Sequence, residues 1–448
     1  MITQNRVNVK DLQLEFQDPD KRSIFEKIVD IDNLKRAFKQ VKRNKGAPGI
    51  DGITIEDYEQ NLEEELHQLK IQVQSWTYKP TPVKRVEIPK PNGKGTRNLG
   101  IPIIKDRVLH MAIKQTIEPI LEPTFSDNSY GFRPGRNQQQ AIQKAQHIVA
   151  SGKEYVVDID LSKFFDRIHH DRLIHRLKTH IADTQILRLI GMILRSGVMI
   201  DGIKVPTEEG SVQGSPLSPL LSNVVLDELD KELEQRGLEY CRFADDCNIY
   251  VRTERGATRV MASIKKFIEK KLKLKVNEDK SKTAKSDQVK FLGMTIIKGT
   301  IAIAKAALKR AMEKVRDLIP RGTNLPIEEA IKAINSWYRG WASYFKMTQY
   351  PSQLQSIEAH IRRRLRARLV SQQKKKRNLI AKLIKRGVAK RLASKTVYTN
   401  RKAWALSHTR ALEKAYPNNW FTDTLSQIIV SDKKLDHWYG LEIWVKLT

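Results

Sequence analysis

Two adjacent aspartates lie in a stretch that otherwise has the composition of β-structure. Asp245 and Asp246 belong to "EYCRFADDCNIYVRT" (239–253), where apolar and aromatic residues flank them on both sides. Two like charges inside an apolar sheet are unfavourable, because unpaired carboxylates resist ionisation there. A hairpin that turns at Ala244 to Asp246 would place both carboxylates at an exposed tip. Aspartate is also common in turns for local hydrogen bonding, so this stretch alone leaves both interpretations open.

A second acidic stretch favours a metal site. "VVDIDLSKFFD" (156–166) puts Asp158 and Asp160 two residues apart on a predicted strand, and hence on one face. A strand end with one aspartate beside a hairpin tip with two would cluster three carboxylates. Their repulsion requires cations, and oxygen ligands select Mg²⁺ or Mn²⁺ over zinc. Two such ions about 4 Å apart can activate a hydroxyl and stabilise a leaving phosphate oxygen in one displacement.

The charge of the chain predicts a polyanionic partner. Its 448 residues include 81 Lys and Arg against 51 Asp and Glu, a net charge of +30 that favours binding to a polyanion. No run of 18 apolar residues and no lipidation signal occur, so we expect nucleic acid and no membrane partner. The N-terminus lacks the apolar core of a signal peptide, and the chain has only two cysteines. Both features predict the cytoplasm.

The elements that would position these residues change character along the chain. Predicted helices and strands intermix to about residue 300, including a hairpin over 83–102 and a strand over 155–161, which indicates an α+β fold. Amphipathic helices are predicted over 305–319 and 330–345. The region 361–402 then holds seventeen Lys and Arg and no Asp or Glu. A block without interspersed acids exceeds an ordinary solvated face.

Six motifs, taken in order, resemble one known family. They are "GFRPGR" (131–136), "DIDLSKFFD" (158–166), "QGSPLSP" (213–219), "FADD" (243–246), "KFLG" (290–293) and "WYRGWASYF" (337–345). Each is weak alone, but the ordered set resembles the bacterial group II intron-encoded reverse transcriptases with maturase function. It is most similar to the short type without an endonuclease domain, as in class C introns.

The resemblance implies a right-hand polymerase with fingers and an antiparallel palm sheet. An α-helical thumb/maturase domain (domain X) and a basic helical C-terminal domain would follow. We therefore expect an N-terminal extension over 1–30 and fingers and palm over 31–300. Thumb/maturase helices would span 301–370, and a nucleic-acid-binding domain 371–448.

The same resemblance assigns the metal ligands. Asp160, Asp245 and Asp246 would be the catalytic residues that bind two Mg²⁺ ions, with Mn²⁺ as a substitute. Asp160 is preferred to Asp158 because it stands five residues before Phe165. At that position the family places an aromatic under the sugar of the incoming nucleotide, where a 2′-hydroxyl would clash. The alternative for Phe165 is a core aromatic.

Further residues are expected to bind the nucleotide. By similarity, Lys90 and Arg97 would face each other across the "PNGKG" turn and grip the triphosphate, although most lysines and arginines are simply solvated. Gln213 and Gly214 would lie beside the primer and nucleotide, the glycine allowing close backbone approach.

A general acid is also expected. Lys280 and Lys282 are equal candidates for the lysine that protonates departing pyrophosphate. A charged loop is the alternative for both.

Three groups of basic residues are candidates for nucleic-acid binding. One lies in the aromatic and basic stretch 129–136, the second lies off the apolar stripe of the helix 305–319, and the third belongs to the block 361–402. They are Arg133, Arg136, Lys305, Lys309, Arg316, Arg362, Arg363, Arg364, Lys374, Lys375, Lys376 and Arg377.

The predicted function is RNA-directed DNA polymerisation with dNTPs on a DNA primer, combined with intron RNA binding that supports splicing and retrohoming. The partners would be group II intron RNA or another RNA template, a DNA primer or target, and dNTPs. Two alternatives stay open: a domesticated relative used in defence or DNA repair, and a non-catalytic RNA-binding maturase. No oligomeric state follows from the sequence.

Overall fold

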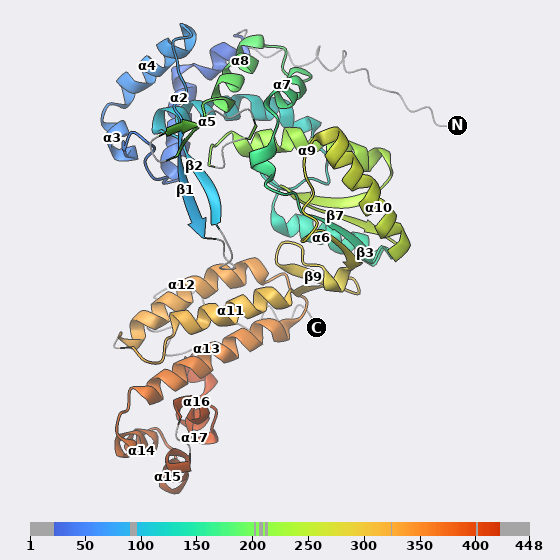
Figure 1. The fold of residues 1–448 in the computed structure, drawn as a ribbon. Helices are drawn as coiled ribbons and strands as arrows, with labels where there is room; N and C mark the ends of the chain where they lie inside the picture. The colour runs from blue at the N-terminus through green and yellow to red at the C-terminus, as the bar shows by residue number, and fades with distance from the viewer. Residues whose placement is uncertain are drawn as a thin grey trace. The chain divides into compact units, whose positions relative to one another are not determined.

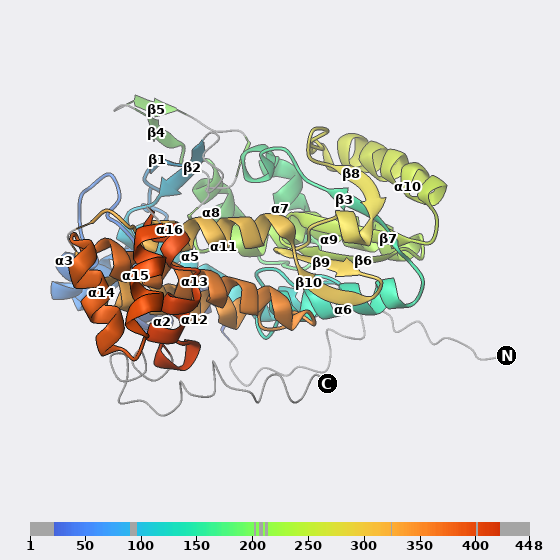
Figure 2. The same cartoon turned by 90° about the horizontal axis from the view of Figure 1, so that it is seen from below.

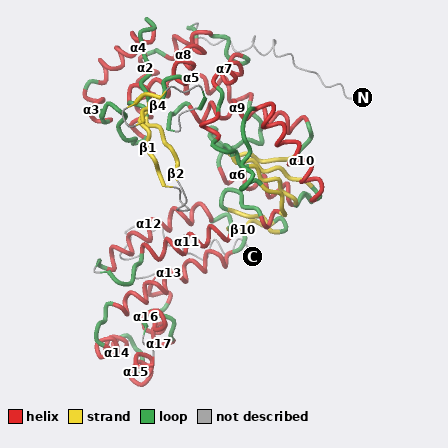
Figure 3. Tube along the Cα trace, viewed as in Figure 1, coloured by secondary structure: helices red, strands yellow, loops and turns green. Residues whose placement is uncertain are grey.

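The computed structural model describes residues 22–89, 96–200, 203–205, 209–210, 214–323, 325–399 and 402–421. The chain forms two compact units, one of residues 1–141 and 157–283 and the other of residues 142–156 and 284–448. Figure 3 shows strands among the helices of the earlier part of the chain and helices alone after β10 (Thr300–Ile303). The predicted α+β class is confirmed.

A four-stranded sheet of the first unit has the order β2-β1-β4-β5 (Figure 2). The predicted hairpin is present as β1 (Val83–Pro89) and β2 (Thr96–Ile101), paired antiparallel with Ile88 opposite Arg97. β4 (Val198–Ile200) pairs parallel to β1, and β5 (Ile203–Val205) pairs antiparallel to β4. The sequence pattern did not predict β4 or β5, because each of these strands is only three residues long.

Helices make up most of the first unit. α2 begins after Asp30, whose carboxylate accepts hydrogen bonds from the next turn, and it packs on α5. α1 falls within the range predicted as an extension, yet Phe25 and Ile28 are buried and α1 contacts α5 and α8. The helices are α1 (Ile24–Ile28), α2 (Ile31–Arg43), α3 (Ile55–Gln60), α4 (Leu62–Gln74), α5 (Ile104–Leu121), α7 (His170–Lys178), α8 (Thr184–Leu194), α9 (Ser218–Gln235) and α10 (Glu254–Phe267).

A second four-stranded sheet carries the acidic motifs. Its order is β6-β7-β3-β8, formed by β6 (Glu239–Phe243), β7 (Asp246–Val251), β3 (Tyr155–Ile159) and β8 (Lys282–Lys285). The inner strands β7 and β3 are largely buried, as their apolar residues require. α9 packs on β6 and α10 on β7. The two acidic stretches of the sequence therefore occupy neighbouring strands.

The second unit contains α6 (Gln138–Ala150) and the hairpin of β9 (Met294–Ile297) and β10. Figure 1 shows α11 (Lys305–Leu318), α12 (Ile327–Phe345) and α13 (Pro351–Ser371) side by side. The first two are the predicted amphipathic helices, and α11 ends before Pro320. At the far end of α13 lie α14 (Lys376–Lys385), α15 (Lys390–Thr399), α16 (Ala403–Leu406) and α17 (Arg410–Ala415).

One apolar core joins α11 to α17 of the second unit, with Val315, Ile334, Leu365 and Leu383 among its buried members. Among the residues described, no helix has the length and apolar character needed to cross a bilayer.

Candidate active site

The paired aspartates lie at the tip of a hairpin. β6 and β7 pair antiparallel with Phe243 opposite Asp246, so Ala244 and Asp245 form a two-residue loop. The residues behind the tip are buried, whereas Asp246 is exposed and Asp245 half-buried. The predicted hairpin is confirmed, except that Asp246 is the first residue of β7 rather than part of the loop. Burial raises the pKa of the neighbouring Cys247 thiol, which is therefore neutral.

A contact between the neighbouring strands β3 and β7 relates the third aspartate to this tip. The two strands are sheet neighbours, and the Asn248 amide donates a hydrogen bond of 2.9 Å to Asp158 Oδ1. Asp160 lies two residues after Asp158, and Asp246 two residues before Asn248. This contact brings the part of β3 just before Asp160 beside the part of β7 just after Asp246. Asp158 is the hydrogen-bonded strand carboxylate, and Asp160 is the one at the strand end.

A turn around residue 280 fixes the backbone of Asp160. Its N–H donates to Ser281 Oγ at 3.0 Å, and its carbonyl oxygen accepts from Asn277 N at 2.8 Å. Lys280 Nζ lies 3.3 Å from the Asp160 carboxylate, whose side chain is 31% exposed. The structure thus brings Lys280 to the site, while Lys282 lies in β8. Sequence reasoning missed Ser281, because a serine in "NEDKSK" has no signal beyond an ordinary turn.

The three aspartates have the type of donor atom that a hard divalent cation prefers. Three carboxylates at solvent-reachable positions supply oxygen ligands and leave room for the waters that Mg²⁺ retains. Within the described ranges, however, no three His, Cys, Asp or Glu side chains are gathered closely enough to hold a metal. The side chains of Asp160, Asp245 and Asp246 would therefore have to turn toward one point, and a cation would compete with Lys280 for Asp160.

Phe165 follows the same strand at the predicted distance. It lies in a short 3₁₀ turn (Phe164–Arg167) that begins after Lys163, a residue with φ of +51°. Phe164 is buried, whereas Phe165 is only half-buried, and the two rings meet edge to face with 5.2 Å between centroids. The core position therefore belongs to Phe164. The backbone of Gly210 lies behind Phe165, held by its N–H bond to Ile168 O.

The predicted nucleotide-side loop is described in part. Gly214 has φ of +122°, and a Cβ there would lie 2.2 Å from the carbonyl oxygen of Gly100 in β2. The close backbone approach that Gly214 allows is therefore an approach to β2. Ser215 Oγ lies 2.9 Å from Nδ1 of His110, and burial lowers the pKa of His110 to about 3, which keeps the ring neutral. Lys90 and Gln213 lie outside the described residues, as does the side chain of Arg97.

The "GFRPGR" segment (131–136) is engaged in contacts within the protein more than with solvent. Arg133 is buried and donates to Glu122 Oε1 at 2.9 Å and to Ser129 O at 3.0 Å. Its predicted contact with nucleic acid is therefore wrong, because the guanidinium is engaged within the protein. Arg136 pairs with Asp127 at 2.6 Å and stays partly exposed, and Phe132 is exposed.

The basic residues of the second unit divide into exposed and buried ones. On α11, Lys305, Lys309 and Arg316 are exposed, as the helical pattern predicts. Arg364 is buried and donates to the carbonyl oxygens of Arg316 and Ile319 at the end of α11. The prediction that it contacts nucleic acid is wrong, since it satisfies carbonyls that the helix end leaves without partners.

The two arginines before Arg364 are partly buried. Arg363 lies over the Trp404 ring at 4.0 Å, and Arg362 pairs with Glu358 at 3.8 Å. Both guanidinium groups therefore have partners within the protein.

The α14–α15 surface is an exposed part of the basic block. Its aromatic residue, Tyr398, is 63% exposed and lies 5.0 Å from Lys376 Nζ. Sequence reasoning overlooked this tyrosine, because a single aromatic within a basic stretch has no distinct pattern. We define the surface by Lys374, Lys375, Lys376, Arg377, Arg391, Lys395 and Tyr398, all exposed.

Comparisons with known proteins agree with this arrangement. Residues 88–296 match the family described as reverse transcriptase (RNA-dependent DNA polymerase), and residues 308–393 match the group II intron maturase-specific domain. Protein YkfC of Escherichia coli is 32% identical over 59% of this chain and 80% of its own length. The group II intron-encoded protein LtrA of Lactococcus lactis is 28% identical over 66% of this chain.

The chain spans 60% of the length of LtrA. A solved structure titled "Partial Cas6-RT-Cas1--Cas2 complex" has 23% identity over 56% of this chain and 43% of that chain, with a TM-score of 0.37. That likeness is too low to bear on function.

Proposed function

Because this chain belongs to the group II intron-encoded reverse transcriptases, RNA-directed DNA polymerases that carry a maturase domain, we propose that Asp160, Asp245 and Asp246 bind two Mg²⁺ ions at the end of a DNA primer. The observation that carries this proposal is the contact between Asp158 of β3 and Asn248 of β7 in neighbouring strands. This contact relates the end of β3, where Asp160 lies, to the hairpin tip that carries Asp245 and Asp246. Mn²⁺, with the same preference for oxygen, would substitute.

Different residues of the chain would bind the metal ions and fix the positions of the carboxylates. Bound metal ions would supply Lewis-acid activation of the primer hydroxyl and of the leaving phosphate oxygen. Asp245 belongs to a loop of two residues and Asp246 is the first residue of β7, so their backbone positions are narrowly set. Ser281 and Asn277 hold the backbone of Asp160. Fixed carboxylates lose little entropy when the site assembles.

Lys280 is the residue we assign to the departing pyrophosphate. Its Nζ is already 3.3 Å from the Asp160 carboxylate, and its side chain is mobile enough to turn toward a leaving oxygen. Displaced from Asp160 by a cation, the ammonium would be free to donate its proton. Lys282 lies two residues further along, in β8, and serves as the matched control.

We expect Lys280→Gln to lower the maximal extension rate by about a hundredfold to ten-thousandfold, the range for loss of a general acid. Lys282→Gln should change it less than threefold. The measurement is the rate of single-turnover dNTP incorporation as a function of pH. The wild-type rate should fall at high pH, and the rate of the variant should not show this fall. Equal effects of the two substitutions would remove Lys280 from this role.

Phe165 is the residue that we propose discriminates between deoxyribose and ribose. We expect Phe165→Val to raise the ratio of rNTP to dNTP incorporation by about tenfold or more, because loss of a steric clash is worth about 1–3 kcal/mol. Phe164→Leu is the matched control, since Phe164 is the buried ring of the pair. It should lower the melting temperature without changing sugar selection. Unchanged rejection of rNTPs by Phe165→Val would exclude Phe165 from the site.

The second part of the proposal is RNA binding in support of splicing and retrohoming. Residues 308–393 match the maturase-specific domain, and most of the exposed α14–α15 surface lies within that range. Phosphate neutralisation by such a surface is independent of sequence. The partners we propose are group II intron RNA and a DNA target, in the cytoplasm of a bacterium. Both cysteines are free thiols, in keeping with that compartment.

Incubation of the purified chain with poly(rA), an oligo(dT) primer, dTTP and Mg²⁺ tests the polymerase activity. We expect incorporation that requires both the RNA template and the divalent ion. A chain that binds intron RNA and incorporates no dTTP would instead be a non-catalytic maturase.

A further inference from the structure

A buried ion pair directly precedes the catalytic hairpin loop. Arg242 of β6 and Asp230 of α9 are both 0% exposed. Arg242 Nε lies 2.8 Å from Asp230 Oδ1 and 3.1 Å from Oδ2, and Nη2 lies 2.5 Å from Oδ2. Burying two charges is costly unless the geometry is good and the remaining donors are satisfied. No step of the proposed reaction uses this pair, so its position needs another explanation.

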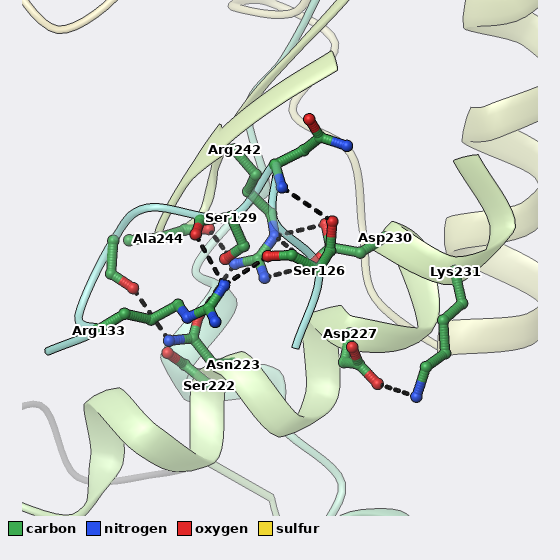
Figure 4. Close-up of polar contacts among 12 residues, drawn as sticks. Ser126, Ser129, Arg133, Ser222, Asn223, Asp227, Asp230, Lys231, Arg242 and Ala244 are labelled. Atoms are coloured by element: carbon green, nitrogen blue, oxygen red, sulfur yellow. Dashed lines mark hydrogen bonds and ion pairs between the residues drawn. The ribbon is translucent and has the colours of Figure 1, made fainter. Parts of the chain in front are cut away.

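The remaining donors of Arg242 reach the loop itself. Nη1 donates to Ala244 O at 2.9 Å and to Asn223 Oδ1 at 3.0 Å (Figure 4). Asn223 and Asp230 are seven residues apart on α9, so two helical turns present them on one face. The guanidinium therefore links α9 to the carbonyl of the residue just before Asp245. A planar fork with five donors can make these contacts at once, and a lysine cannot.

A second segment closes on the loop from the other side. Asn223 Nδ2 donates to Gly131 O at 3.0 Å, and a Cβ on Gly131 would lie 2.1 Å from Ala244 N. The backbone of Arg242 also exchanges hydrogen bonds with the segment 128–130, each 2.9 Å long. Ala244 itself has φ of +57°, which is uncommon for a residue with a side chain. Such a conformation persists where its surroundings fix it.

We propose that Arg242 is a positioning residue that, with Asn223 and Gly131, fixes the Ala244–Asp245 loop and so orients the carboxylates of Asp245 and Asp246. This inference rests on the proposed function. It adds that the metal site depends on a charge network buried behind the hairpin. Fixed ligand positions favour metal binding, because supporting contacts outside the ligand set commonly change metal affinity by about 10–100-fold. Loss of the network should therefore weaken metal binding before it abolishes the fold.

The test uses Arg242→Lys in the full chain, which retains a positive charge beside Asp230. We expect the Mg²⁺ concentration for half-maximal primer extension to rise at least fivefold, with partial recovery of the rate at saturating Mg²⁺. Hydrogen–deuterium exchange of peptides covering 239–251 should become faster without metal, and Mn²⁺ binding measured by electron paramagnetic resonance should weaken to a similar degree. The last two readouts do not depend on activity.

Asn223→Ala provides a milder variant if Arg242→Lys does not fold. It leaves the contacts of Arg242 with Asp230 intact and removes the link to Gly131, so a smaller shift in the same direction is expected. Arg368→Lys is the matched control, since Arg368 is buried and donates to the carbonyl oxygen of Pro326 in the second unit. It should lower the melting temperature and leave the Mg²⁺ requirement unchanged.

Unchanged Mn²⁺ binding and unchanged exchange in both hairpin variants would overturn the inference, whatever their melting temperatures. That outcome differs from failure of the proposed function, which would appear as wild-type protein without template-dependent incorporation.

Discussion

Replacing Asp245 or Asp246 with asparagine is expected to reduce primer extension by about a thousandfold or more, equivalent to about 4 kcal/mol of transition-state stabilisation. The amide has nearly the same shape as the carboxylate but is a poor ligand for a hard cation. Because Asp246 is exposed and Asp245 half-buried at the tip, neither change should unfold the protein. RNA binding should stay within about twofold of wild type.

Asp158→Asn is the matched control for these variants. It makes the same chemical change in the same sheet, on a residue that is hydrogen-bonded to Asn248 rather than placed at the strand end. We expect its extension rate to fall by less than tenfold. The measurements are single-turnover extension on an RNA template and intron RNA binding by filter retention. Parallel loss of extension and RNA binding in the Asp245 and Asp246 variants would indicate a structural role for these carboxylates.

Neutralising Lys374, Lys375, Lys376 and Arg377 with glutamine is expected to weaken intron RNA binding by about tenfold or more near physiological salt. All four are exposed at the start of α14. If each contacts one phosphate, the slope of log affinity against log salt should decrease by about three, because each phosphate contact releases a fraction of a counterion. Extension of a short primer at low salt should change little.

A control with the same loss of charge separates a local surface from general attraction. Lys266, Lys270, Lys271 and Lys273, at the end of α10 and just after it, are exposed lysines of the first unit. Their replacement by glutamine removes four charges as well. For this control variant, we expect the slope of log affinity against log salt to differ from the wild-type slope by less than one. Titrations at several salt concentrations measure both sets. Equal slopes for the two quadruple variants would mean that net charge alone governs binding.

Much of this arrangement was predictable because local patterns determine it. The hairpin at Ala244–Asp245, the hairpin of β1 and β2, and the helices α11 and α12 all follow from alternation, turn residues and helical spacing. The family assignment followed from ordered motifs whose residue types are demanding. These features depend on neighbours in the sequence.

What sequence reasoning missed depends on contacts between distant segments. Arg133 and Arg364 have the same composition signals as exposed arginines, and only the fold shows that they satisfy internal carboxylate and carbonyl groups. Gly214 needs its freedom for an approach to Gly100, which is more than a hundred residues away. Arg242 directly precedes the "FADD" motif, yet its partner Asp230 lies on α9.

The most direct test is a crystal structure of the chain with an RNA template, a dideoxy-terminated DNA primer, the next dNTP and Mn²⁺, with anomalous scattering to locate the ions. We predict two anomalous peaks about 4 Å apart, with carboxylate oxygens of Asp160, Asp245 and Asp246 within about 2.4 Å of one or both. Peaks that lack Asp160 as a ligand, or ions bound away from the Ala244–Asp245 loop, would contradict the account.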